Sequence, residues 1–394
     1  RPYGGVACVW GVLADRSRIE EIVQGAAFPG ANVRQVGEFV LLARSGPLPG
    51  AADWSHAEAD AASTGASADE LRSPKSLLWF DAAQRWHKFP GQNQVRVVAG
   101  RLVLLEEGLM RASDVYTGRK LWEVELSDEP RDRQGMRYSR HREWGPRPSL
   151  SPWTELVVVP DAIYLGSGTS CRVFDPATGQ PTGRIELPTD LGTPWANLRV
   201  CDDHLVGSSG PHVLCVNRRT GQLLWRVEAA RSSLYLAVGN GKVFCAELAN
   251  PQRGEDETRD GSIFAVSLAS GERLWQRAGG ARLRYSPALD LVVTPTVFYR
   301  GADGEPVSPQ APATNTRLVV IGGGLPKTGL PALIAGPRLL AGSDETLQVY
   351  GLPTAEPIGE SLTWVRRGCT GTLASTHLLT TRYRGNSAWI DLTS

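Results

Sequence analysis

One short pattern recurs along this chain. The stretch CVNRRTGQLLWRVE (215–228) is followed fifty residues later by AVSLASGERLWQRA (265–278), and each has a tryptophan four residues after a glycine. The pattern occurs again in ASDVYTGRKLWEVE (112–125) and, weakened, in VFDPATGQPTGRIE (173–186). Repeats of this kind build a fold from copies of one supersecondary unit, because a single copy cannot bury its apolar face alone. The repeat therefore constrains the architecture more than any other feature.

The four copies share positions on both sides of the glycine. A short polar side chain four residues earlier can hydrogen-bond a nearby backbone amide, and glycine can adopt a positive φ without a Cβ penalty. We interpret each copy as a tight hairpin whose second strand carries the tryptophan. The glycines are Gly118, Gly179, Gly221 and Gly271, preceded by Asp114, Asp175, Asn217 and Ser267 and followed by Trp122, Gly183, Trp225 and Trp275.

The spacing of the glycines indicates the size of the unit. Successive glycines lie 61, 42 and 50 residues apart, and a fifth copy, VYGLPTAEPIG, puts Ala355 at the glycine position 84 residues after Gly271. Because 84 is twice 42, we expect a degenerate copy between Leu283 and Leu330, containing LDLVVTPTVFY and TRLVVIGGG. A period near 42 fits the about 40–45 residues of a four-stranded propeller blade.

The tail D-x-x-T-G-x-x-x-W resembles the PQQ-like (quinoprotein-type) β-propeller repeat, over roughly residues 75–394. The resemblance implies an all-β propeller of four-stranded blades. Seven blades are visible, and an eighth is expected if sequence beyond Ser394 supplies it. In that family the tryptophan packs against the neighbouring blade, so the repeated tryptophans are expected to be structural.

Both ends of the repeat region carry partial copies. AWIDLTS, at the C-terminal end, aligns with RASDVYT, which puts Asp391 at the Asp114 position. SLLWF (76–80) has the pattern of an outermost strand, with Trp79 as its docking residue. We expect this strand to complete the last blade by pairing the two ends of the propeller.

Residues 1–48 follow a different pattern. GGVACVWGVL predicts a strand, and FPGANVRQVGEFVLLARSG predicts a hairpin. DRSRIEEIVQGAAF predicts a helix on which Ile19, Ile22 and Val23 can pack inward. Strand, helix and hairpin in this order resemble the last third of a class I SAM-dependent methyltransferase domain. The alternative is a capping segment of the propeller. The cofactor loop of that family lies in its N-terminal half, so SAM is expected only if a complete upstream domain exists.

Residues 49–74 are rich in Ala, Ser, Gly and Pro, which predicts a linker. Its DWSHAEADAASTGAS portion resembles the segment that leads into many PQQ-like propellers, where Trp54 and His56 could dock it on the ring. The compartment depends on what precedes the chain: cytoplasmic for a methyltransferase fusion, periplasmic for a protein with a signal peptide.

Composition excludes several classes of function. The chain has 42 Lys and Arg against 41 Asp and Glu, a net charge of +1, which gives no bulk electrostatic reason to bind nucleic acid or an anionic membrane. No apolar run approaches the ~20 residues of a membrane span. The six cysteines include no adjacent or C-x-x-C pair, and Cys171, Cys215 and Cys245 lie in strand-like runs where burial is expected.

The sequence lacks the residues that a quinone cofactor site requires. A quinoprotein dehydrogenase holds its quinone under a disulfide between adjacent cysteines and binds calcium through carboxylate and amide oxygens. The sequence has no Cys-Cys and no such oxygen cluster, so PQQ and calcium are disfavoured, and no catalytic residue is predicted. No G-x-S-x-G, H-E-x-x-H or P-loop motif occurs.

Two clusters remain as candidate contact sites. WVRRGCTGTLASTHLLTTRYR brings Arg366, Arg367, Cys369 and His377 close together in sequence, which could line an anion-binding funnel. The alternative is solvent-facing strand ends around a buried thiol. The basic insertion RDRQGMRYSRHREWGPRP contains Trp144 and could be a partner-docking loop.

The sequence favours a non-catalytic propeller that binds or scaffolds, appended to a larger, methyltransferase-fused protein. Its partner would be a protein or a small-molecule ligand at a propeller face. One alternative is a quinoprotein-type oxidoreductase that uses PQQ. Another is a scaffold like the outer-membrane assembly factor of this fold.

Overall fold

The computed structural model describes a large part of the 394-residue chain. The described residues are 3, 5–11, 15–26, 28, 30–70, 78–79, 94–106, 108–126, 131–132, 149–150, 155–248, 257–294, 297–307, 330–342, 346–363, 371–374, 378–383 and 386–391.

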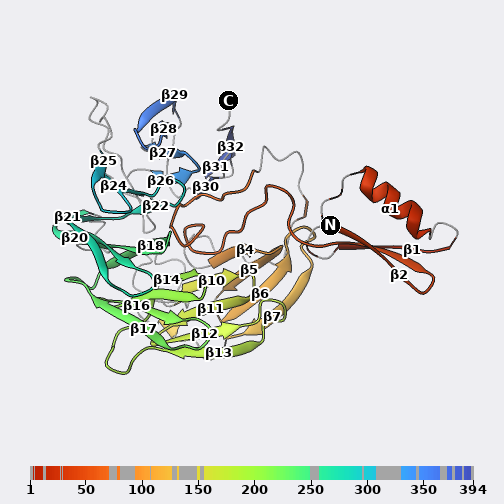
Figure 1. Ribbon diagram of the computed structural model, residues 1–394, viewed down its shortest axis with the longest axis horizontal. Coiled ribbons are helices and arrows are strands. Elements are labelled where there is room, and N and C mark those ends of the chain that lie inside the picture. The colour runs from red at the N-terminus through yellow and green to blue at the C-terminus, as the bar shows by residue number, and fades with distance from the viewer. Residues whose placement is uncertain are drawn as a thin grey trace, which may run out of the picture.

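Six four-stranded antiparallel sheets and one three-stranded sheet follow one another along the chain (Figure 1). We number them blades 1 to 7. Blade 1 contains β4 (Gln94–Val98), β5 (Arg101–Glu106), β6 (Leu109–Asp114) and β7 (Lys120–Glu125); blade 2 contains β10 (Glu155–Val159), β11 (Ala162–Ser167), β12 (Ser170–Phe174) and β13 (Pro181–Glu186); blade 3 contains β14 (Ala196–Cys201), β15 (His204–Ser209), β16 (His212–Asn217) and β17 (Leu223–Glu228); blade 4 contains β18 (Leu234–Gly239), β19 (Lys242–Glu247), β20 (Glu257–Ser267) and β21 (Arg273–Ala281). Blade 5 contains β22 (Arg284–Ser286), β23 (Leu291–Val293), β24 (Phe298–Arg300) and β25 (Pro306–Val307); blade 6 contains β26 (Leu330–Ala335), β27 (Arg338–Gly342), β28 (Thr346–Gly351) and β29 (Glu356–Thr363); blade 7 contains β30 (Gly371–Ala374), β31 (Leu378–Tyr383) and β32 (Asn386–Asp391).

The first strand of each blade contacts the first strand of the next, from β4 through to β30. Each blade is a meander in sequence order, so these first strands surround a common axis and the last strands lie outside. This arrangement is the predicted β-propeller. A two-stranded sheet, β8 (Arg131–Asp132) with β9 (Ser149–Leu150), lies in the chain between blades 1 and 2.

The repeated turn has the same geometry in each complete copy. In blade 1 the carboxylate of Asp114 accepts hydrogen bonds from the backbone N–H of Thr117 and from its hydroxyl, both at 3.0 Å. Gly118 follows with a φ of +69°, and the register between β6 and β7 shifts by one residue. Equivalent shifts occur in blades 2, 3 and 4. The glycine with an adjacent bulge follows from the hairpin geometry that the sequence predicts.

Each repeated tryptophan contacts the turn of the following blade. The indole N–H of Trp122 donates to Pro176 O at 3.0 Å, that of Trp225 to Leu268 O at 2.8 Å, and that of Trp275 to Gly301 O at 3.0 Å. The ring also lies against the turn glycine, and a Cβ on Gly271 would be 2.8 Å from the Trp225 ring. Glycine is thus required at this position for space as well as for φ.

Trp79, from the incomplete copy, makes the same kind of contact. Its indole donates to Val115 O at 2.8 Å and lies against Gly118, the turn glycine of blade 1. The rest of the expected strand 76–80 falls outside the described residues, so its pairing with blade 7 remains a prediction. β32 ends at Asp391 as β6 ends at Asp114, in agreement with the expected alignment.

Blade 5 lies within the range Leu283 to Leu330 expected for the degenerate copy, and its described strands run from Arg284 to Val307. Its turn glycine is Gly304, with a φ of +69°, in the sequence YRGADGEPV. Arg300 occupies the Asp position, and its carbonyl accepts from Gly304 N at 2.9 Å. TRLVVIGGG, which we expected to contribute to this blade, lies outside the described residues.

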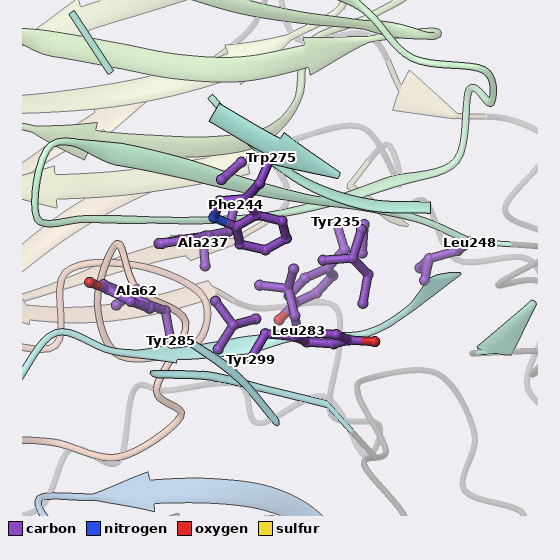
Figure 2. Close-up of a cluster of buried hydrophobic side chains, with 13 residues drawn as sticks. Ala62, Tyr235, Ala237, Phe244, Leu248, Trp275, Leu283, Tyr285 and Tyr299 are labelled. Atoms are coloured by element: carbon purple, nitrogen blue, oxygen red, sulfur yellow. The ribbon is translucent and has the colours of Figure 1, made fainter. Parts of the chain in front are cut away.

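Apolar side chains fill the space between adjacent blades. In Figure 2, Phe244 and Trp275 of blade 4 pack against Tyr285 and Tyr299 of blade 5, together with Ala62 from the linker. The three cysteines expected to be buried, Cys171, Cys215 and Cys245, have no exposed surface. Within the described part of the chain, no helix combines the length and apolar character needed to cross a membrane.

The N-terminal segment forms a separate sheet, with β1 (Gly5–Val9), β2 (Ala31–Val36) and β3 (Phe39–Arg44) in the order β1-β3-β2 and all pairs antiparallel. The predicted helix is α1 (Arg16–Gly25), which Asp15 caps by accepting from Arg18 N. The expectation that Ile22 packs inward is wrong, since this side chain is 57% exposed. Ile19 and Val23 of the same helix are partly buried, and α1 contains no fully buried residue.

The indole contact makes a specific stability prediction. Trp225→Ala should lower the free energy of unfolding by about 3–5 kcal/mol, because it removes a buried ring and leaves the Leu268 carbonyl without its donor. Leu224→Ala is the matched control, as Leu224 is 41% exposed on the same strand, and should change stability by less than about 0.5 kcal/mol. Urea denaturation measures both, and equal effects would contradict a structural role for the indole.

Candidate functional site

A connected set of polar contacts lies at the propeller axis, and residues 54–65 occupy it. We call these residues the hub segment. They leave the N-terminal sheet and run through the middle of the ring (Figure 1). Trp54 pairs with Val97 of β4 in both directions, with N···O distances of 2.7 and 3.0 Å.

Each of the first six blades donates one backbone N–H to the hub segment, from the same position of its innermost strand. The acceptors follow in sequence as the blades do, so the segment winds around the axis in the order of the blades. The pairs are Val97 N to Trp54 O (3.0 Å), Val158 N to Ser55 O (3.0 Å), Val200 N to His56 Nε2 (3.0 Å), Val238 N to Ala61 O (2.8 Å), Tyr285 N to Ala62 O (3.0 Å) and Ile334 N to Thr64 O (2.9 Å).

The hub segment adopts unusual backbone angles to reach all six strands. Ala59 and Ser63 have φ values of +71° and +57°, and Gly65 has +73°. A left-handed conformation costs an alanine or serine roughly 1–2 kcal/mol and persists only where the surroundings enforce it. Here the six inner-strand donors do so.

His56 replaces a carbonyl in this series. Its Nε2 accepts from Val200 N, so the ring is neutral and Nδ1 carries the proton, which it donates to Ser55 Oγ at 2.7 Å. Burial, reinforced by the nearby guanidinium groups of Arg199 and Arg96, holds the pKa of His56 well below its usual value. Trp54 and His56 thus contact the ring, as the linker's resemblance suggested.

Charged side chains converge on the hub segment from two blades. Arg199 of β14 donates through Nε and Nη2 to Ser63 Oγ at 3.2 and 2.9 Å. Arg284 of β22 pairs with Glu58, with 3.2 Å between Nη1 and Oε2. The hydroxyl of Tyr235, on β18, donates to the same oxygen. Burial raises the pKa of Glu58, but Arg284 and the Tyr235 hydrogen bond outweigh it and lower the pKa overall.

Sequence reasoning missed these arginines, although the repeats contain a signal for them. Arg96, Arg199 and Arg284 each precede the inner-strand donor, in QVRVV, NLRVC and RLRYS of blades 1, 3 and 5. All three are at most 4% exposed. A charge inside an apolar strand, repeated in alternate blades, is unusual because a buried arginine must be paired or hydrogen-bonded.

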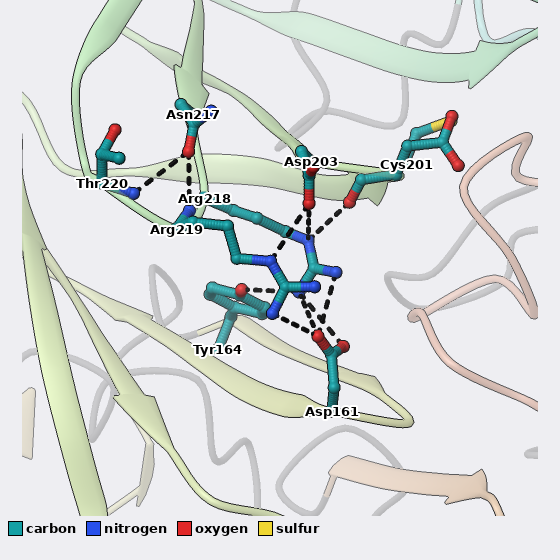
Figure 3. Close-up of polar contacts among 9 residues, drawn as sticks. Asp161, Tyr164, Cys201, Asp203, Asn217, Arg218, Arg219 and Thr220 are labelled. Atoms are coloured by element: carbon teal, nitrogen blue, oxygen red, sulfur yellow. Dashed lines mark hydrogen bonds and ion pairs between the residues drawn. The ribbon is translucent and has the colours of Figure 1, made fainter.

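A second polar cluster joins blades 2 and 3 at their turns (Figure 3). Arg218 donates to Asp161 at 3.1 Å and to the Tyr164 hydroxyl at 3.1 Å, and Arg219 donates to Asp203 at 3.1 Å. Burial raises the pKa of Asp161, but the hydrogen bond from Arg218 outweighs it and lowers the pKa. The carboxylates are about half exposed, so this cluster is an inter-blade clamp of modest strength.

The candidate contact residues named from sequence cannot be placed. Arg366, Arg367, Cys369, His377 and Trp144 all lie outside the described residues. Among the residues that the structure does describe, no three His, Cys, Asp or Glu side chains come together as a metal site requires.

Comparison with known proteins agrees with the repeat. A family profile described as "Outer membrane protein assembly factor BamB" matches residues 167–310, from the end of β11 through blade 5. The match covers less than half of the chain. The matched blades are of the PQQ-like repeat type that the sequence predicts.

A curated relative is the serine/threonine-protein kinase AfsK of Streptomyces coelicolor. It is 29% identical over 138 residues, which make up 35% of this chain and 15% of the kinase. The chain therefore spans only a small part of the relative that it matches.

Among solved structures, BamB from Moraxella catarrhalis aligns with a TM-score of 0.48 and 12% identity, over 75% of this chain and 80% of BamB. The quinohemoprotein alcohol dehydrogenase ADHIIG from Pseudomonas putida HK5 aligns with a TM-score of 0.49 and 13% identity, over 84% of this chain and 69% of that chain.

The state of His56 predicts a pH dependence. Because its pKa is lowered in the folded chain, the unfolded chain binds one more proton below about pH 6.5. This site then contributes stability above that pH and loses it as the pH falls, by up to about 1.4 kcal/mol per pH unit. His56→Gln should show a shallower loss between pH 6.5 and 5, measured by urea denaturation. Identical slopes for the two proteins would contradict the neutral, acceptor role of His56.

Proposed function

We propose that this chain is a non-catalytic β-propeller module that binds or scaffolds, and that it is an accessory part of a larger protein. The observation that carries the proposal is the occupied axis. Six blades direct one N–H each onto the hub segment, so the centre of the ring is filled by the chain's own backbone. A planar cofactor at this position would have to displace residues 54–65 and leave those donors without acceptors.

The accessory role is supported by the curated relative, in which the matched 138 residues are 15% of the protein. We propose the same kind of arrangement for this chain, with a different neighbour. The sheet β1-β3-β2 with α1 has the strand, helix and hairpin order that resembles the end of a methyltransferase domain. Val6, Val36 and Phe39 are each at least 45% exposed on this sheet, which suits a segment that packs against further α/β structure.

Two other functions remain as alternatives. A quinoprotein-type oxidoreductase is favoured only by the repeat type, and the chain lacks the adjacent cysteines of that site. A scaffold related to the outer-membrane assembly factor is favoured by the family profile over residues 167–310. The second alternative shares the binding role that we propose and differs in the partner.

A cofactor titration separates the binding module from the oxidoreductase. We expect that incubating the protein with PQQ and Ca²⁺, followed by gel filtration, leaves no quinone absorbance in the protein fraction. The physical reason is the filled axis. Stoichiometric co-elution of the quinone with the protein would overturn the proposal, and a quinoprotein dehydrogenase run in parallel is the positive control.

A further inference from the structure

One carboxylate of the hub segment, that of Glu58, is hydrogen-bonded by two side chains from the surrounding blades. Glu58 belongs to the hub segment, whereas Arg284 and Tyr235 belong to the innermost strands of blades 5 and 4. Both donors reach one oxygen of Glu58, Oε2. The carboxylate is therefore bound by the ring in the way that a separate ligand would be.

The donors are held by contacts other than Glu58. The same Nη1 of Arg284 donates to Ser63 O, and a Cβ on Gly65 would be only 2.6 Å from it, so the guanidinium is fixed on two sides. The Tyr235 ring lies under the guanidinium of Arg282, with 5.4 Å to the ring centroid. Removing the Glu58 carboxylate should thus leave Arg284 and Tyr235 in place.

The site has a donor that Glu58 does not use. Arg284 is 3% exposed, and its Nε has no hydrogen-bond acceptor among the described residues. Arg199 approaches the same segment, and its hydrogen bonds within the described part of the chain go to neutral oxygens, those of Ser63 and Leu198. The nearby Asp60 accepts the N–H and the hydroxyl of Thr64, and it interacts with Arg199 and Arg284 through its charge without a direct hydrogen bond to either among the described residues.

The Glu58 side chain is only partly buried. The Glu58 side chain is 22% exposed, whereas that of Arg284 is 4% exposed. Because part of this side chain contacts solvent, the space that Glu58→Ala vacates is accessible to a small anion.

We propose that Arg284 and Tyr235 form a carboxylate-binding site on the propeller axis, that Glu58 is its built-in occupant, and that the ligand class of this module is a small-molecule carboxylate that competes with Glu58. The inference rests on the proposed binding function and specifies where that binding takes place. The charge-assisted contact from Arg284 Nη1 and the hydroxyl of Tyr235 make a carboxylate oxygen the matching acceptor.

The test replaces the built-in occupant with one from solution. Glu58→Ala should melt below the wild-type protein in sodium chloride. Sodium acetate at the same ionic strength should raise the melting temperature of the variant by at least about 2 °C, and should leave that of the wild-type protein unchanged relative to chloride. Differential scanning fluorimetry across a series of acetate concentrations gives the apparent affinity.

Two control variants make the rescue specific. Glu186→Ala removes a carboxylate that is 56% exposed on blade 2, and acetate should not affect it. Glu58→Ala combined with Tyr235→Phe lacks one donor, and its response to acetate should be at least several-fold weaker than that of Glu58→Ala.

Equal melting of Glu58→Ala in acetate and chloride would overturn the proposal. If this variant does not fold in chloride, its refolding yield from urea is compared in the two salts. Recovery in acetate alone supports the site, and failure in both overturns it. The quinone titration tests the binding-module proposal separately, so the failure of one is distinguishable from the failure of the other.

Discussion

The structure depends on six hydrogen bonds that backbone N–H groups donate at the axis, five to carbonyls and one to the imidazole of His56. The innermost strand of a propeller blade is an edge strand, and its unpaired N–H groups face the centre of the ring. Water could satisfy them in an open channel, but here the chain supplies its own acceptors. The hub segment accepts a hydrogen bond from one N–H of each of blades 1 to 6. Its backbone is left-handed at Ala59 and Ser63. The hub segment consequently connects six blades to one another.

The outside of the ring is joined by a different interaction. Trp79, Trp122, Trp225 and Trp275 each lie on the turn glycine of the next blade and donate to a carbonyl there. Blade 2 has Gly183 at this position, and the polar clamp of Arg218 with Asp161 joins blades 2 and 3. Adjacent blades are therefore joined at two places: near the axis by hydrogen bonds to the hub segment, and near the outer strands by the tryptophan contacts.

The sequence was sufficient for the fold because glycine, bulge and indole are local features that repeat. It predicted the blades, the turn glycines and the buried cysteines. The sequence was less informative where a copy is degenerate. The last turn of blade 5 has Arg300 at the Asp position, and the motif does not describe a turn of this kind. The hub arginines were missed because their partners are distant in sequence, with 226 residues between Arg284 and Glu58. Only alignment of the inner strands of the repeats would have revealed Arg96, Arg199 and Arg284 as one position.

The direction in which the hub segment winds has a consequence for how the protein folds. The segment precedes all seven blades, and its acceptors, from Trp54 to Thr64, meet the blades in the order of synthesis. Each newly made blade can therefore pack against the hub segment, which has already been made, and no segment needs to be threaded through a finished ring. The propeller can therefore assemble around the hub segment from blade 1 onwards. The last contacts span the greatest sequence separation and are expected to form most slowly.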